Sequence, residues 1–369
     1  MVVAPRNSKS ATVICLSETQ NTSNVGRAWL APPLIAAFSL VAMLAIASLE
    51  GLPIRDPDAR YVGSPLALIG LIAAIFIVLD VGPRAWLRRR MSGSESPAAS
   101  PFAVLRERWF NRRGAMVLVA LLSFYVTYLS YRNLKSFIPF VSDADHDIGL
   151  LGLDRSMFFG NDPATIMHSI FGTGISAELL SMVYLAFLTF VPVSLGVALI
   201  WSSNLRAGLW YVTTLSLCWL FGAASYFMFP AQGPVYAQPG LYSNLPETGV
   251  SRLQETLAEH RLEVLAGPNA TEAVQSVAAF ASLHIAVVFA AALIAQLLKG
   301  PRFLRIGLWS MLALTGVATI YFGWHYVIDD VAGLAIGASA VVLGALACGY
   351  ELHLPAWLRT ARQSRATAT

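Results

Sequence analysis

Residues 278–298 read AAFASLHIAVVFAAALIAQLL and contain no Asp, Glu, Lys or Arg. A run of about 20 apolar residues is what a helix needs to cross a bilayer. Similar runs lie near residues 28–49, 62–82, 115–133, 177–200, 207–229, 304–322 and 330–350. Because lipid-exposed backbone must form its hydrogen bonds within its own segment, each run predicts a helix. We therefore expect an all-α, polytopic membrane protein with about eight transmembrane helices.

The composition of the chain points the same way. Of its 369 residues, 56% are hydrophobic and 12% are charged, whereas soluble domains carry about 25% charged residues. The arginines behind the net charge of +4 cluster in a few loops, which argues against nucleic-acid binding. The three cysteines, Cys15, Cys218 and Cys348, have no recognisable metal-site or disulfide spacing.

Basic residues predict the orientation of the chain. Segment 83–114 contains eight arginines, and loop 299–303 and its flank add Lys299, Arg302 and Arg305. Loop 230–277, of opposite parity, has two arginines against five glutamates. Because positive loops stay in the cytoplasm, both termini are predicted cytoplasmic and loop 230–277 outside.

A secretory signal peptide is an alternative interpretation of the first apolar run. Ala45-Ile46-Ala47 resembles a cleavage site. The long polar leader and the length of the run favour a retained helix instead. The tails 1–26 and 355–369, and the Ser- and Pro-rich stretch 91–101, are predicted to be disordered.

Two histidines are predicted to share one membrane boundary. His284 lies at the outer start of run 278–298, and His325 follows the outer end of run 304–322. Antiparallel helices joined by the short inner loop 299–303 must pack together. Asp329 follows His325 by one helical turn, on the same face. Two histidines with one acid favour phosphoryl transfer through a covalent histidine intermediate.

These residues also resemble a known family. Ser282-x-His284 followed by His325-x-x-x-Asp329 is similar to the second and third motifs of the type 2 phosphatidic acid phosphatase superfamily. The run 324–333, WHYVIDDVAG, looks most like the inositol phosphorylceramide synthase (aureobasidin-target) branch. Phe229–Pro234 occupies the place of that branch's Pro-rich first motif, and segment 153–160 resembles its interfacial segment.

The resemblance implies a division of the chain. It covers roughly residues 115–350, which implies a six-helix catalytic core in that range. Residues 27–114 are then two additional transmembrane helices with a basic cytoplasmic loop, between the cytoplasmic tails 1–26 and 351–369.

Departures from the family motifs bear on the reaction. The phosphatases carry KxxxxxxRP as the first motif and SRxxxxxHxxxD as the third, but stretch 229–243 has no Lys or Arg, and Ala318-Thr319 replaces the Ser-Arg pair. The transferase branch also lacks much of this cationic set, so the departures favour transfer. The candidates for substrate binding are Ser282, Gln232, Tyr236, Thr319, Tyr321 and Arg155, with Arg252 and Arg261 as further outer-loop cations.

The resemblance implies a role for each catalytic residue. His325 attacks phosphorus, Asp329 orients it, and His284 serves as acid and base; no metal or other cofactor is implied. The predicted function is a membrane phosphotransferase that moves a phospho-head-group, such as inositol phosphate, from a lipid donor to a lipid or glycan hydroxyl. The alternatives are a lipid or polyprenyl phosphate phosphatase and a non-catalytic transporter or scaffold. The sequence does not predict an oligomeric state.

Three further features of the outer segments are interpreted from the residues. The acidic cluster 143–147 lacks the spacing of a known cation loop, so a solvated loop is favoured over a metal site. Asp330 lies about 100° around the helix from Asp329 and is interpreted as structural or solvated. One apolar stripe is formed by Val250, Leu253, Leu257 and Val264, which predicts an amphipathic helix lying across the site. This helix is interpreted as a lid, an acceptor-binding element or a simple packing element.

Overall fold

The computed structural model describes residues 15–16, 25–56, 65–92, 100–202 and 204–353. These residues are helical apart from loops and one pair of two-residue antiparallel strands, β1 (Cys15–Leu16) and β2 (Leu352–His353). The predicted disordered stretches 1–26, 91–101 and 355–369 lie largely outside the described residues.

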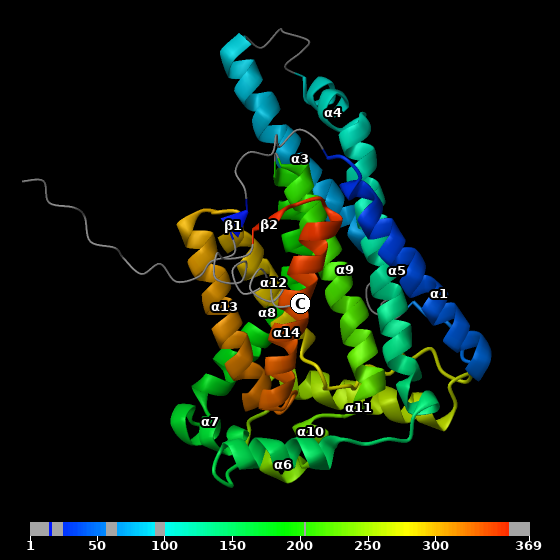
Figure 1. Ribbon diagram of the computed structural model, residues 1–369. Helices are drawn as coiled ribbons and strands as arrows, with labels where there is room; N and C mark the ends of the chain where they lie inside the picture. The colour runs from blue at the N-terminus through cyan, green and yellow to red at the C-terminus, as the bar shows by residue number, and fades with distance from the viewer. Residues whose placement is uncertain (1–14, 17–24, 57–64, 93–99, 203, 354–369) are drawn as a thin grey trace, which may run out of the picture.

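One helix coincides with each of the eight predicted runs (Figure 1). Six of them are long and apolar enough to cross a membrane, counted over the described residues. They are α1 (Ala31–Glu50), α5 (Arg112–Val141), α8 (Ile175–Gly196, continued by the π-helical turn Val197–Trp201), α9 (Leu205–Met228), α13 (Arg302–Tyr321) and α14 (Val327–Ala347). The other two are α3 (Pro65–Ser92) and α12 (Leu283–Leu297), which is apolar but has only 15 residues. The chain is thus an all-α, multi-pass membrane protein.

Local sequence explains several helix ends. The α1 helix starts with prolines at its first turn and ends at Gly51, whose φ of +65° suits glycine. Asn111 caps α5 by accepting from the backbone N–H groups of Arg113 and Gly114. Asn204 caps α9 in the same way through Ala207. Side-chain caps therefore fix where two core helices begin.

Close packing between α12 and α14 brings the two histidine motifs together. A Cβ on Gly333 would lie 2.4 Å from the Ser282 carbonyl oxygen, and one on Gly337 would lie 2.7 Å from the Ala286 carbonyl oxygen. Small residues at these positions let the backbones approach. The N-terminal ends of α12 and α14 consequently lie side by side.

Short helices gather at one end of the bundle, at the bottom of Figure 1. They are α6 (Asp147–Met157), α7 (Pro163–Phe171), α10 (Pro234–Ala237), the 3-10 turn η4 (Pro239–Tyr242) and α11 (Gly249–Ala266). The α11 helix confirms the predicted amphipathic helix, since Val250 and Val264 are buried while Glu255 and Glu259 are exposed.

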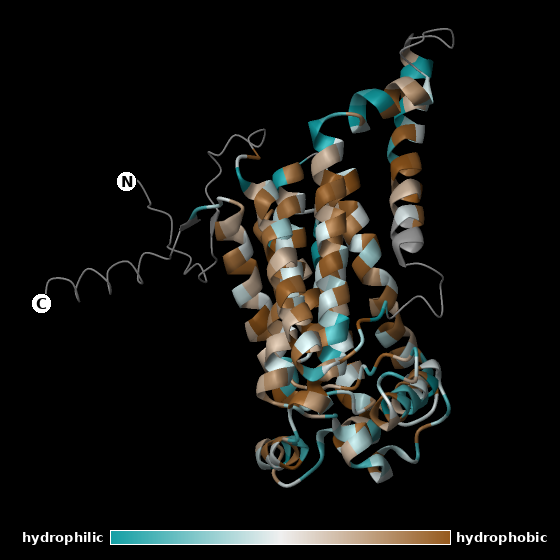
Figure 2. Cartoon of the chain, turned by 90° about the vertical axis from the view of Figure 1, so that its right-hand side faces the viewer, coloured by the Kyte–Doolittle hydropathy of each residue, from teal (hydrophilic) through white to brown (hydrophobic). Residues whose placement is uncertain are grey.

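The opposite end of the bundle carries α4 (Pro101–Trp109) and the arginine-rich segment (Figure 1). There the buried Asp80 of α3 pairs with Arg84 and with Arg108 of α4. Figure 2 shows the long helices mostly hydrophobic between two more hydrophilic ends. The molecule therefore has a basic end and a separate end of short helices.

Candidate active site

His325 lies in the turn between α13 and α14, and Asp329 stands behind it. The His325 side chain is 6% exposed, and its Nδ1 is 3.5 Å from Oδ2 of the fully buried Asp329. The same Oδ2 accepts a hydrogen bond from the Tyr326 backbone N–H at 2.9 Å. The carboxylate therefore faces Nδ1, and Nε2 is the ring nitrogen directed away from it.

The surroundings of His325 keep its imidazole neutral. Burial lowers the pKa of His325 from 6.5 to about 3, and the positive charge of Lys135 adds to the effect. The nearby Ala279 carbonyl partly opposes this pKa shift. A neutral imidazole is the form that can act as a nucleophile.

His284, the second residue of α12, is held by two aromatic rings of α8. Its ring centroid lies 4.6 Å from that of Tyr184 and 4.2 Å from that of Phe187. The His284 and His325 rings are 5.9 Å apart. The two histidines from different motifs thus meet at one place.

Backbone hydrogen bonds join the segments that carry the histidines. The Ser282 N–H donates to the Asp329 carbonyl at 3.0 Å, which ties the start of α12 to that of α14. Thr319 Oγ1 donates to Asp330 Oδ2 at 3.0 Å, which ties α13 to α14. Asp330 is 9% exposed, so it fits the interpretation as a structural residue and not as a solvated one.

Two acids of α6 anchor the segments around the site. Asp147 accepts from the N–H groups of Gln232 (2.7 Å) and Gly233 (2.9 Å) and from the Tyr326 hydroxyl (2.9 Å). Asp154 accepts from the Val327 N–H at 3.0 Å. Burial raises the pKa of both carboxyls, that of Asp154 to about 6.

The position of Asp147 corrects the interpretation of cluster 143–147 as a solvated loop. Its side chain is only 3% exposed because its carboxylate binds two remote backbone segments. Sequence reasoning missed the anchoring role of Asp147 and Asp154. The available signal was their seven-residue spacing, which puts both on one helix face.

A cavity of about 600 Å³ opens at the two histidines. Its polar end is lined by His284, His325, Gln232, Tyr236, His260, Glu272, Arg132 and Lys135. From there an apolar arm follows α8 from Tyr184 to Ile200, a rise of about 24 Å in an α-helix. Leu188, Val191 and Leu195 of α8 line this arm, with Leu121 and Phe124 of α5 and Ala73 of α3. The shape suits a ligand with a polar head and a long apolar chain.

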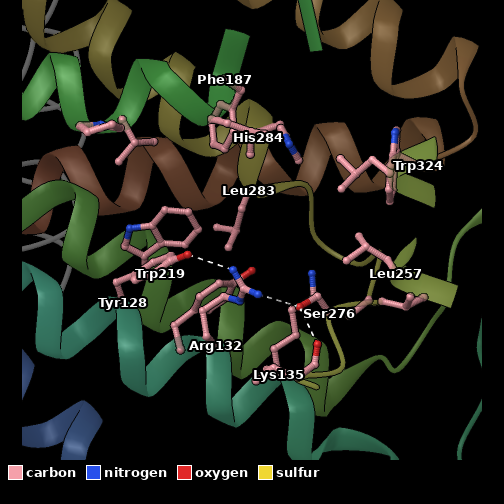
Figure 3. A pocket seen from close by; sticks show the side chains of 18 of the residues that line it. Tyr128, Arg132, Lys135, Phe187, Trp219, Leu257, Ser276, Leu283, His284 and Trp324 are labelled. Carbon is pink, nitrogen blue, oxygen red and sulfur yellow. Dashed lines mark hydrogen bonds between the residues drawn. The ribbon is translucent and has the colours of Figure 1, made fainter. Parts of the chain in front are cut away.

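Arg132 and Lys135 of α5 were not among the predicted site residues. Figure 3 shows both on the cavity wall, with Arg132 between Tyr128 and Ser276. A signal for them existed in the sequence: two cations three residues apart at the end of an apolar run. Ionisable residues inside membrane helices are costly and usually functional.

Of the six predicted substrate-binding residues, two line the cavity and four lie elsewhere. Gln232 and Tyr236 line it. Ser282 and Thr319 are fully buried and do not line it. The Tyr321 hydroxyl donates to the Gly172 carbonyl at 2.8 Å, and Arg155 pairs with Asp162 at 2.8 Å.

The α11 helix forms part of the cavity wall. Leu253, Thr256, Leu257 and His260 of α11 line it. Gln254 Nε2 donates to the Phe322 carbonyl at 2.8 Å, close to His325 in the chain. This helix therefore covers the polar end of the cavity.

Comparison with known proteins identifies one family. Residues 148–343, just over half of the chain, match the model of the PAP2 superfamily, the type 2 phosphatidic acid phosphatases. The match includes both histidine motifs and ends before the last residues of α14. No curated protein and no solved structure matches the chain.

Proposed function

The chain belongs to the PAP2 superfamily of phosphatase and phosphotransferase enzymes, and from this premise we propose that it is a membrane phosphotransferase. It would move a phospho-head-group, such as inositol phosphate, from a lipid donor to a lipid or glycan hydroxyl. The observation that carries the proposal is the pair of histidine rings, 5.9 Å apart, at the mouth of a cavity with a long apolar arm. A lipid donor would place its phosphate at the histidines and its chain in the arm.

In the first step, Nε2 of His325 attacks phosphorus and the bond from phosphorus to the donor oxygen breaks. His284 is the general acid: it takes up a proton when the anionic donor phosphate binds and gives that proton to the leaving oxygen. The product is a phosphohistidine on His325 and a free lipid alcohol. Asp329, which faces Nδ1 at 3.5 Å, orients the ring and stabilises its developing positive charge.

In the second step, neutral His284 takes the proton of the acceptor hydroxyl. The acceptor oxygen attacks phosphorus, the bond from phosphorus to Nε2 breaks, and His325 is regenerated. The covering position of α11 supports an organic acceptor, because a wall of Leu253 and Leu257 disfavours bulk water near the phosphohistidine.

Hydrolysis is the second candidate function, and Arg132 and Lys135 favour it. The lack of Lys and Arg in stretch 229–243 favours transfer, because the phosphatases of the family have cations there. The cavity, however, is lined by two basic residues of α5. A phosphatase would use the same two steps with water as the acceptor. The fate of the phosphate therefore decides between the two reactions.

The test uses the purified full-length protein with phospholipids labelled at phosphorus. Transfer predicts that the label reappears on an added lipid or glycan acceptor, and hydrolysis predicts free inorganic phosphate. The His325→Ala variant should lose either product while keeping the wild-type elution volume and melting temperature. Wild-type turnover by His325→Ala would exclude both reactions as proposed.

A further inference from the structure

Lys135 and Arg132 lie outside every motif and before the family match begins at residue 148. We propose that these two residues of α5 bind the phosphate group of the lipid substrate, in place of the cations absent from the motif segments. The proposal rests on the proposed function of the cavity and names its anion-binding residues. Three observations carry it.

The first observation is position. Arg132 and Lys135 are three residues apart in α5, so both side chains leave the same face of that helix. Both line the cavity whose wall also contains His284 and His325. Lys135 therefore shares one cavity with both candidate catalytic rings.

The second observation is the neutral surroundings of the Lys135 ammonium. Its Nζ lies 4.8 Å from the centroid of the Tyr226 ring. Within the described residues, Lys135 forms no ion pair with a carboxylate. An ammonium group is a compact, strongly hydrated charge. An ammonium group that lies over an aromatic face, with no carboxylate partner among the described residues, is well placed to receive an anion from the cavity.

The third observation is the balance of charge at the polar end. Nη1 of Arg132 donates to the Tyr128 hydroxyl at 2.9 Å, and Nη2 donates to Ser276 Oγ at 3.1 Å. These hydroxyls orient the guanidinium. The carboxylate on the cavity wall, Glu272, has an 89% exposed side chain and faces Arg55 at 3.8 Å. Among the described residues, Arg132 and Lys135 are thus the basic side chains of Arg and Lys type that line the cavity.

A phosphate group matches this arrangement. Charge-assisted hydrogen bonds from Arg or Lys to phosphate oxygens are shorter and about twice as strong as neutral ones. Arg supplies a planar fork and Lys a point charge, so together they can hold different oxygens of one phosphate. Phosphorus would then be fixed near Nε2 of His325.

The experiment measures equilibrium binding in the His325→Ala background, so that the result does not depend on turnover. The probes are dioctanoyl phosphatidic acid and dioctanoylglycerol, which differ only in the phosphate. Binding is followed by the fluorescence of Trp219 and Trp324, which line the cavity. Arg252→Gln is the matched control, because Arg252 is exposed and pairs with Glu247 outside the cavity.

We expect the parent to bind phosphatidic acid at least tenfold more tightly than the diacylglycerol. Lys135→Gln and Arg132→Gln should each remove most of that preference without changing diacylglycerol binding. Lys135→Arg should restore it, and Arg252→Gln should not affect it. Equal binding of the two probes by the parent, or an unchanged preference in Lys135→Gln and Arg132→Gln, would overturn the proposal. If the wild type showed no turnover but the binding results were as expected, the proposed reaction would be wrong and the proposed phosphate-binding residues would stand.

Discussion

At the residue scale, the nucleophile is oriented by a carboxylate that solvent does not reach. Asp329 is fully buried and also accepts from the Tyr326 backbone N–H. That second hydrogen bond fixes the side chain independently of His325. The electrostatic role of Asp329 can therefore be separated from its structural role by a substitution that keeps its shape.

Asp329→Asn should lower kcat by a factor on the order of 10³ to 10⁴, because the amide keeps the shape but cannot stabilise a positive imidazole. KM should change little, since Asp329 is behind His325 and does not line the cavity. Turnover of labelled phospholipid measures both constants. Asp330→Asn is the control, because it disturbs the hydrogen bond from Thr319. It should lower the melting temperature while kcat stays close to the wild-type value. A kcat near wild type in Asp329→Asn would contradict the assigned role.

The depressed pKa of His325 predicts an acid-dependent loss of stability. Burial holds this pKa at about 3, against 6.5 for an ordinary histidine. Between these values the unfolded chain binds a proton that the folded protein excludes, so falling pH favours unfolding. Above pH 6.5 this penalty disappears. One such group contributes about 1.4 kcal/mol per pH unit at most.

The measurement is the melting temperature in detergent from pH 7 to pH 4.5. We expect the wild type to lose stability more steeply below pH 6.5 than His325→Gln, in which no group titrates at this position. The difference between the two curves isolates His325 from Asp154, whose raised pKa acts in the opposite direction. Parallel curves would show that His325 is not held neutral.

At the element scale, α8 lines the cavity along most of its length. Val191 faces the apolar arm, whereas Val193, two residues away, is 48% exposed on the outside of the bundle. Val191→Trp should fill the arm and lower kcat/KM for long-chain phospholipids at least tenfold relative to dioctanoyl ones. Val193→Trp is the matched control and should leave that ratio unchanged. A chain-length ratio unaffected by Val191→Trp would show that the lipid chain lies elsewhere.

Helices were more predictable from the sequence than the contacts among them. The eight apolar runs and the stripe of α11 are local patterns, and each appears as a helix. Which residues line the cavity, in contrast, depends on how each helix is rotated about its own axis. Thr319 and Tyr321 were selected because they lie near a motif in the chain, yet their hydroxyls bond to Asp330 and Gly172.

The same limit explains the residues that were missed. Lys135 belongs to no motif, and it shares a cavity with the histidines because α5 and α8 both line that cavity. Asp147 and Asp154 act on backbone groups at Gln232 and Val327, far away in the chain. By contrast, the pairing of His325 with Asp329 followed from helical spacing alone.

At the scale of the whole molecule, the basic end and the catalytic end are opposite one another. The arginines of α3 and α4 lie at one end, and α6, α7, α10 and α11 surround the site at the other (Figure 1). The β1–β2 pair joins residues near both termini, so these segments lie on one side of the bundle. Because positive segments stay in the cytoplasm, we propose cytoplasmic termini and a site on the outer face of the cell membrane.

Cysteine labelling of intact cells tests this orientation. In a Cys15→Ser background, the remaining cysteines Cys218 and Cys348 are buried and should react little. Arg252→Cys, in α11, should react with a membrane-impermeant maleimide in intact cells, because α11 is on the site's side of the bundle. Arg106→Cys, in α4, should react only after the membrane is permeabilised. The reverse pattern would place the histidines in the cytoplasm, and the donor lipid would then have to come from the inner leaflet.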